Sequence, residues 1–113
     1  MPLLKPLKSR YADDPEMSDL IEMFVARLPI QITSMVQTLN GDPHPDFIQS
    51  VHQLKGTGAL VGFDPITQSA AVIQREIRVH GRDPLELEPQ VRELILLCRR
   101  ARHWARASTT GSD

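Results

Sequence analysis

Four Asp-Pro pairs divide this chain into segments of similar length. They lie at residues 14–15, 42–43, 64–65 and 83–84. Aspartate is a preferred N-cap residue and proline is favoured in the first helical turn, so each pair predicts the start of a helix. Gly41, Gly62 and Gly81 stand shortly before the last three pairs, where a preceding helix would end. This punctuation predicts four helices, near 15–40, 43–62, 65–80 and 84–107.

Each predicted helix carries apolar residues at helical spacing, which indicates one buried side. Pro29 falls inside the first of these stripes and predicts a kink or a local opening there. Aromatic residues make up 4% of the chain and no stretch alternates as a strand does. The stripes are Leu20, Ile21, Phe24, Leu28, Ile32, Met35 and Leu39; Phe47, Val51, Leu54, Gly58 and Val61; Ile66, Ala70, Ile73 and Ile77; and Val91, Leu94, Ile95, Cys98, Ala101 and Ala105.

Short connections make sequential helices antiparallel neighbours, so the expected fold is all-α: an antiparallel up-down four-helix bundle. A short N-terminal helical lead-in is expected near residues 3–11. The domain should span residues 1–107, followed by a disordered tail at 108–113.

Length and charge place this chain among small soluble domains. Its 113 residues fit one domain, and its net charge of −1 gives no reason to expect nucleic acid or an anionic membrane as partner. Cys98 is the only cysteine, which fits a reducing compartment. The first residues, MPLLKPLKSR, hold no signal-peptide core, and no apolar run is long enough to span a membrane. We therefore expect a cytoplasmic protein.

The predicted helix at 43–62 contains two interior glycines, within the stretch VHQLKGTGALVG at residues 51–62. Each costs a helix about 1 kcal/mol relative to alanine, so each position needs a reason to lack a side chain. On a helical wheel Gly58 lies within the apolar stripe, where it lets another helix approach closely or makes room for a bulky neighbour. Gly56 lies on the opposite, solvent-facing side, which internal packing does not explain. We expect Gly56 to give room to a docking macromolecule.

One histidine lies beside Gly56, away from the apolar stripe. His52 has Lys55 one turn along and the small residue Ala59 near it. Neutral imidazole is a nucleophile at one ring nitrogen while the other carries the proton. A phosphoryl group on that nitrogen would bring about two negative charges, which Lys55 is placed to offset. Gln74, beside the third apolar stripe, is a candidate to accept the proton of the unreactive ring nitrogen through its carbonyl.

These residues resemble the histidine-containing phosphotransfer (HPt) domain family. Its central pattern is His-x-x-Lys-Gly, six further positions and often a closing glycine; here HQLKG occupies 52–56 and the closing glycine is Gly62. In some members a glutamine 22 positions after the phosphorylated histidine orients the imidazole, and Gln74 stands at that position. The upstream segments DDPEM and EMFVARLP also resemble the family's lead-in, so the resemblance covers about residues 3–105.

The resemblance implies a role for each of these residues. His52 would be the phosphoacceptor and Lys55 the charge partner of the phosphoryl group. Gly56 would give clearance for docking, and Gln74 would orient the imidazole. Helix geometry adds further docking positions around them, at Ile48, Gln49, Ala59 and Phe63.

The resemblance also implies the partners. A phosphoryl group would pass from an aspartyl phosphate on a response-regulator receiver domain to the histidine, and onward to another receiver, with a hybrid histidine kinase upstream. The Mg²⁺ used in the transfer belongs to the receiver, so the chain is expected to hold no metal or cofactor of its own. GTGALVG lacks the pattern of a phosphate-binding P-loop. We expect a monomeric phosphotransfer intermediate without an ATP site or autonomous kinase activity.

Two other functions stay open. The chain could be an interaction module that docks receivers without accepting a phosphoryl group. A histidine kinase dimerisation domain is also helical with an exposed histidine, but Gln53 rather than an acidic residue follows His52, and these 113 residues hold no ATP-binding domain.

The remaining histidines, the cysteine and the C-terminal arginines are interpreted as structural. His44, His80 and His103 are too far apart in sequence for a zinc site, and Cys98 lies on an apolar stripe. A basic patch near the C-terminus is expected to complement the carbonyl end of the last helix, with a membrane or nucleic-acid contact as the alternative. It consists of Arg99, Arg100, Arg102 and Arg106.

Overall fold

Residues 4–110 fold into four α-helices, with one turn of 3₁₀-helix before the first and one in each of the last two connections. This computed structural model describes residues 4–110, with side chains through residue 107. The α-helices are α1 (Ser18–Leu39), α2 (Phe47–Gly58), α3 (Asp64–Arg78) and α4 (Glu88–Thr110). The 3₁₀ turns are η1 (Pro15–Met17), η2 (Ala59–Val61) and η3 (Pro84–Leu87). The carboxylates of Asp14 and Asp83 accept backbone hydrogen bonds at the starts of η1 and η3, as the Asp-Pro pairs predict.

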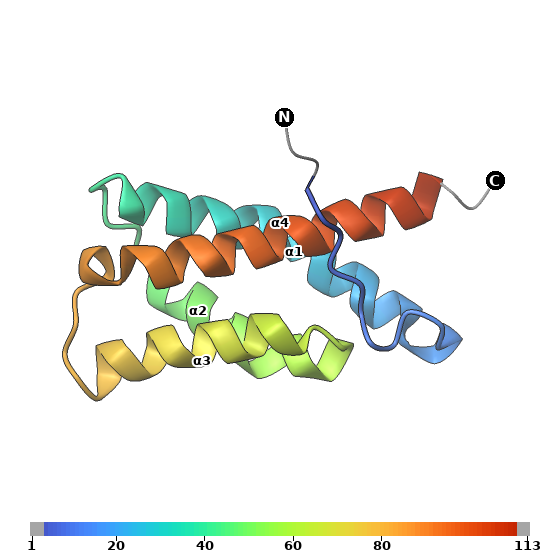
Figure 1. Cartoon of the computed structure of the whole chain (residues 1–113), viewed down its shortest axis with the longest axis horizontal. Helices are drawn as coiled ribbons and strands as arrows, with labels where there is room; N and C mark the ends of the chain where they lie inside the picture. The colour runs from blue at the N-terminus through green and yellow to red at the C-terminus, as the bar shows by residue number, and fades with distance from the viewer. Residues whose placement is uncertain (1–3, 111–113) are drawn as a thin grey trace.

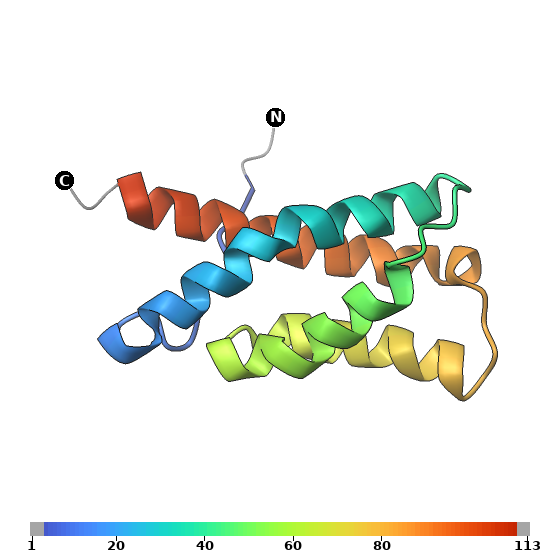
Figure 2. The same cartoon turned by 180° about the vertical axis from the view of Figure 1, so that it is seen from behind.

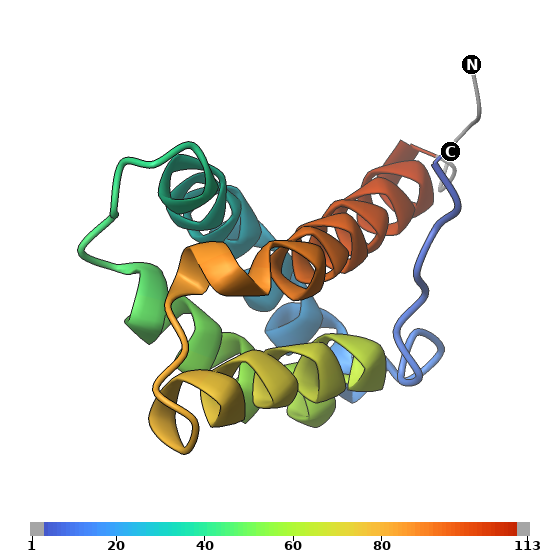
Figure 3. The same cartoon turned by 60° about the vertical axis from the view of Figure 1, so that its left-hand side comes forward.

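The helices form two layers around one core. α1 and α4 lie together in one layer, and α2 and α3 lie together in the other (Figures 1 and 2). The turned view shows the four helices arranged around a common centre (Figure 3). Consecutive helices run antiparallel, and residues 4–110 contain no strand. The predicted all-α four-helix bundle is confirmed.

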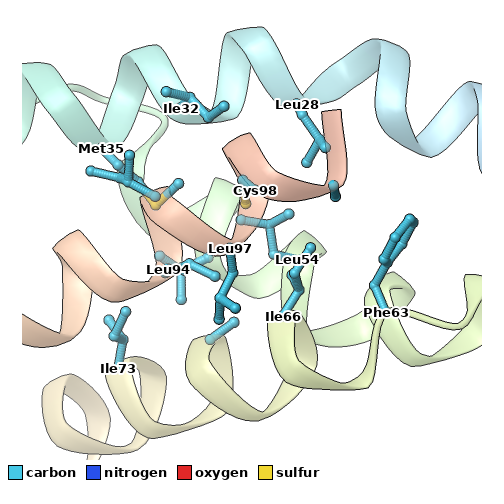
Figure 4. Packing of buried hydrophobic residues seen from close by; sticks show 14 of the residues in the cluster. Leu28, Ile32, Met35, Leu54, Phe63, Ile66, Ile73, Leu94, Leu97 and Cys98 are labelled. Atoms are coloured by element: carbon cyan, nitrogen blue, oxygen red, sulfur yellow. The ribbon is translucent and has the colours of Figure 1, made fainter. Parts of the chain in front are cut away.

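Apolar side chains from every α-helix fill the space between the layers (Figure 4). All five residues of the stripe predicted for the second helix are buried: Phe47, Val51, Leu54, Gly58 and Val61. Burial raises the pKa of the Cys98 thiol to about 12, so the unreactive thiol form persists at neutral pH. The prediction of burial is wrong at one stripe position. Leu20 is 51% exposed, because α1 and α2 leave a groove between them at that end of the bundle.

α1 continues through Pro29 as a single helix. In a regular helix the N–H of residue 29 would donate to the Val25 carbonyl, but proline has no N–H, so this hydrogen bond is missing. The helix changes direction near its middle, in the region of this proline (Figure 2). The hydroxyl of Thr33 donates a hydrogen bond of 2.9 Å to the Pro29 carbonyl.

The predicted helical lead-in near residues 3–11 is wrong over the part that the structure describes. Residues 4–9 have no regular secondary structure, because Pro6 supplies no backbone donor and disfavours a helical conformation in the residue before it. The segment is held instead by backbone hydrogen bonds of 3.0 and 2.8 Å to the carbonyls of Arg100 in α4 and Gly62 after α2. Residue 3 lies outside the described residues.

With the adjoining 3₁₀ turns counted as part of each helix, two helix ends differ from prediction by three residues or more. α2 begins at Phe47 rather than at 43, because Pro45 disfavours a helical conformation in the residue before it. α4 runs to Thr110, so the disordered tail predicted from 108 is wrong for 108–110; residues 111–113 lie outside the described part of the chain. The sequence has no helix-breaking residue between 107 and Gly111, which explains the longer helix.

Candidate functional site

α2 presents one side to the core and the other to solvent. Val51 and Leu54 are buried, whereas His52, Lys55 and Gly56 are exposed. This division follows the helical period, since residues three and four apart share a side. The histidine, the lysine and the glycine singled out from the sequence therefore lie together on the surface of α2.

α3 reaches His52 through Gln74. The amide nitrogen Nε2 of Gln74 lies 2.9 Å from Nδ1 of His52. Gln74 is buried, with 7% of its surface exposed, where α3 packs beside α2 (Figure 1). No residue in the described part of the chain hydrogen-bonds to Nε2 of His52. The ring is thus held at one nitrogen and free at the other.

The orientation of the Gln74 amide is opposite to the one predicted from the sequence. Its nitrogen, rather than its carbonyl, faces Nδ1, and its oxygen Oε1 is buried without a hydrogen-bond partner. An N–H that donates to Nδ1 requires the ring proton on Nε2, whereas a carbonyl facing Nδ1 requires it on Nδ1. A half-turn of the amide about its terminal bond exchanges the two groups, so Gln74 can hold either tautomer of His52.

Two cationic residues lie one helical turn from the members of this pair. Lys55 lies one turn beyond His52, is exposed, and makes no ion pair within residues 4–107. Arg78 lies one turn beyond Gln74 and lines a small cavity together with Gln74 and Ile48. Sequence reasoning did not include Arg78 in the site. Its spacing of four residues from Gln74, which puts both on one side of α3, is the signal that was available.

The two interior glycines of α2 have different surroundings. A Cβ at Gly56 would meet nothing within 4 Å, so no neighbour in the domain requires glycine there. A Cβ at Gly58 would lie 2.6 Å from Oγ1 of Thr67 and 3.3 Å from the carbonyl oxygen of Phe63. Gly58 therefore admits α3 at close range, as its place in the apolar stripe predicts, while the space at Gly56 is open.

Three of the four further docking positions are accessible. Ile48 is 51% exposed, Gln49 is exposed and Ala59 is half-buried. The prediction for Phe63 is wrong, because this residue is fully buried (Figure 4). Its ring stacks on Phe24 with centroids 5.4 Å apart, and such a large apolar ring gains more from the core than from solvent.

Sequence reasoning missed a groove of about 380 Å³ between α1 and α2. Three apolar side chains at the groove are well exposed: Leu20 by 51%, Met23 by 66% and Leu60 by 69%. Gln53 and Leu60, three residues before and four residues after Gly56, both line the groove. The groove is therefore continuous with the His52 surface across Gly56. Its lining residues are Leu20, Met23, Phe24, Arg27, Gln31, Gln53, Thr57, Leu60 and Val61.

The remaining candidates are metal sites, membrane-spanning helices, His44 and the C-terminal basic patch. Residues 4–110 contain no group of three or more His, Cys, Asp or Glu that could hold a metal ion. In the same part of the chain, each helix is too short or too polar to cross a membrane. Nδ1 of His44 accepts a hydrogen bond of 3.0 Å from the Asp46 N–H in the α1–α2 connection. Arg100, from the basic patch, donates one of 2.9 Å to the Lys5 carbonyl.

Comparison with protein families places these observations in a known group. The family model of the Hpt domain matches residues 19–104, a region that contains His52, Lys55, Gly56 and Gln74. No curated protein and no solved structure matches the chain. Hpt domains act in histidine phosphotransfer in phosphorelays, and they interact with receiver domains of response regulators and kinases. Because the match covers most of the chain and the fold is a four-helix bundle, this protein belongs to the Hpt domain family.

Proposed function

We propose that this protein carries phosphoryl groups between receiver domains, with His52 as the acceptor. Nε2 of His52 attacks the phosphorus of an aspartyl phosphate on a receiver. The bond from phosphorus to the aspartate oxygen breaks, the carboxylate leaves, and a nitrogen–phosphorus bond forms while the ring proton stays on Nδ1. The reverse exchange passes the group to the aspartate of a second receiver. The protein is a stoichiometric intermediate in this scheme.

The contact between Gln74 and His52 is the observation that carries the proposal. An exposed imidazole ordinarily has both nitrogens in water, but here Nδ1 lies 2.9 Å from a buried amide. With Oε1 of Gln74 turned toward an Nδ1 that carries the proton, the lone pair of Nε2 is free for attack. The same carbonyl stabilises the positive charge that the ring acquires when Nε2 takes the phosphoryl group.

Lys55 and Arg78 offer the charge that the phosphoryl group needs. Phosphorylation adds about two negative charges to the surface beside them. Phosphoryl transfer depends mainly on positioning and on stabilising this charge, rather than on covalent chemistry by the protein. Two cations at the edges of the Gln74–His52 pair suit that requirement.

A receiver domain would cover the outer surface of α2. Gly56 and Ala59 leave room close to the histidine, and Ile48 and Gln49 border that space. The groove between α1 and α2 extends the surface with exposed apolar side chains, which on soluble proteins commonly mark an interface.

The proposal also includes the source of Mg²⁺, the upstream kinase, the oligomeric state and the cellular compartment. The Mg²⁺ for the transfer comes from the receiver, and a hybrid histidine kinase supplies the upstream receiver. The protein acts as a monomer in the cytoplasm.

Transfer from a phosphorylated receiver tests the proposal. The full chain is mixed with a receiver that carries labelled phosphate, in the presence of Mg²⁺, and the label on each protein is followed over time. We expect label on the wild-type chain and on His103→Gln, which alters an exposed histidine in α4. We expect none on His52→Gln. Equal labelling of His52→Gln would contradict the proposal.

The same experiment separates the rival functions. A receiver that binds the chain without transferring label would favour a docking module that accepts no phosphoryl group. Labelling by ATP alone would favour a kinase dimerisation domain.

A further inference from the structure

A threonine on α3 is hydrogen-bonded to the last turn of α2. Oγ1 of Thr67 accepts a hydrogen bond of 2.6 Å from the Ala59 N–H and donates one of 3.1 Å to the Lys55 carbonyl. A hydroxyl has one proton and two lone pairs, so it can make both bonds at once. Ala59 and Lys55 are four residues apart, the spacing of donor and acceptor in an α-helical turn. The Thr67 hydroxyl therefore bridges the two ends of the final turn of α2.

Gly58 is the residue that makes this bridge possible. A Cβ at that position would lie 2.6 Å from Oγ1 and 3.2 Å from the backbone nitrogen of Thr67, so a side chain there would push α3 away. The α-helix also gives way to the 3₁₀ turn at Ala59, directly beside the bridge. Hydrogen bonding of a side chain to the helical ladder is a known cause of such irregularity. The bridge thus accounts for a glycine that costs α2 about 1 kcal/mol.

α3 contacts the functional surface at two places. Thr67 and Gln74 are seven residues apart, about two helical turns, so both project from the side of α3 that faces α2. Gln74 holds the ring of His52, and Thr67 holds the backbone of Lys55. The ammonium group of Lys55 has no ion pair within residues 4–107, which leaves the backbone as the anchored part of this residue.

We propose that Thr67 is a positioning residue for phosphotransfer: its hydroxyl sets the backbone of Lys55 so that the ammonium group meets the phosphoryl group on His52. This inference rests on the proposed function. Because phosphoryl transfer depends on the placement of charge around the phosphorus, a small shift of the Lys55 turn lowers the rate even when the fold persists.

A double-mutant cycle tests the inference on the full chain. Thr67→Val keeps the size of the side chain and removes the hydroxyl, whereas Thr67→Ser keeps the hydroxyl. The rate of transfer to His52 is measured at saturating phosphorylated receiver. We expect Thr67→Val to lower this rate about tenfold and Thr67→Ser to restore most of it. In a Lys55→Ala background we expect Thr67→Val to cause no further loss, because the group it positions is gone.

Several outcomes would overturn it. An unchanged rate in Thr67→Val, or an equal fold loss in the Lys55→Ala background, would show that Thr67 does not act through Lys55. Hydrogen exchange at the Ala59 amide reports the bridge without any transfer, and its protection should fall in Thr67→Val and persist in Thr67→Ser.

Two further results keep the test decisive. If circular dichroism shows that Thr67→Val does not fold, Thr67→Ala replaces it in the same cycle, since it removes the hydroxyl without placing a methyl group against Ala59. A wild-type chain that takes no label overturns the proposed function, and the Thr67 inference falls with it. Transfer that is indifferent to Thr67 overturns the inference alone.

Discussion

The two sides of α2 are joined to their neighbouring helices in different ways. On the side of α3, polar side chains reach across the interface and bond to α2 at defined points. Gln74 lies 2.9 Å from the His52 ring, and Thr67 bonds to the backbone on both ends of the last turn. Gly58 lets the helices come close enough for these contacts.

On the side of α1, polar side chains mainly pair with one another. The Ser34 and Ser50 hydroxyls are hydrogen-bonded at 3.0 Å, and the Gln31 amide nitrogen donates to the Gln53 amide oxygen at 3.2 Å. Oε1 of Gln31 is buried without a partner, as Oε1 of Gln74 is on the other side, but the α1–α2 interface opens into the groove of about 380 Å³. None of these four residues contacts the histidine ring through a hydrogen bond.

This difference indicates a division of labour around one helix. A phosphocarrier needs an imidazole held in one orientation and, next to it, a surface that a partner can reach. In the proposed function, the α3 side supplies the first and the α1 side supplies the second. Changes on the α3 side should therefore alter rate constants or stability, and changes at the groove should alter affinity for the receiver.

Removal of the Gln74 amide should have the largest effect. Gln74→Leu keeps a buried side chain of similar size but leaves Nδ1 of His52 without its partner. We expect the transfer rate at saturating receiver to fall between about tenfold and hundredfold, the range known for residues that orient metal-binding imidazoles. ¹⁵N chemical shifts of the ring should show a mixture of tautomers. Gln68→Leu, an exposed glutamine of α3, is the control; an equal loss in that variant would contradict the role of Gln74.

A pair of glycine substitutions tests the close approach of α3. Gly58→Ala should destabilise the domain by about 2 kcal/mol, because its Cβ would lie 2.6 Å from Oγ1 of Thr67. Gly56→Ala should stabilise it by up to about 1 kcal/mol, because alanine favours the helix and the space is open. Urea denaturation of both variants gives the free energies of unfolding. Similar changes in the free energy of unfolding for the two variants would refute the close approach of α3 at Gly58.

Truncation at the groove should have the smallest effect, confined to binding. Combining Met23→Ala with Leu60→Ala removes two exposed apolar side chains and should raise the KM for the phosphorylated receiver about tenfold, or about 1.4 kcal/mol. The rate at saturation should not change, since neither residue bonds to His52. Leu85→Ala, a leucine of η3 that is 52% exposed, is the matched control. A lower saturating rate with an unchanged KM would place these residues in the reacting site instead.

Much of the fold could be predicted because its signals are local. An Asp-Pro pair acts within one turn, and an apolar stripe reflects the period of a single helix. For the same reason His52, Lys55 and Gly56 could be placed on one exposed side of α2 from their spacing alone. Gln74 lies on another helix; its place beside the third apolar stripe made it a candidate, and the family resemblance added its spacing of 22 residues from His52.

The errors have two kinds of physical cause: packing against distant residues at Phe63, and the local presence or absence of helix-breaking residues at the ends of the predicted helices. Phe63 follows a closing glycine and was expected at the surface, but the core offered its ring Phe24 and Trp104 as neighbours. Residues 4–9 were expected to be helical, but Pro6 left them irregular, and the Leu7 N–H donates to the Arg100 carbonyl in α4. No local pattern reports such contacts.

By its own periodicity and capping residues, then, the amino-acid order is sufficient to specify four helices, their buried sides and an exposed histidine with a cation one turn away. The orientation of the Gln74 amide, the hydroxyl bridge from Thr67 to the Lys55 turn, and the groove beside α1 arise only when the helices pack. Each of these depends on how closely two helix backbones approach, and that distance is set by all the side chains between them at once.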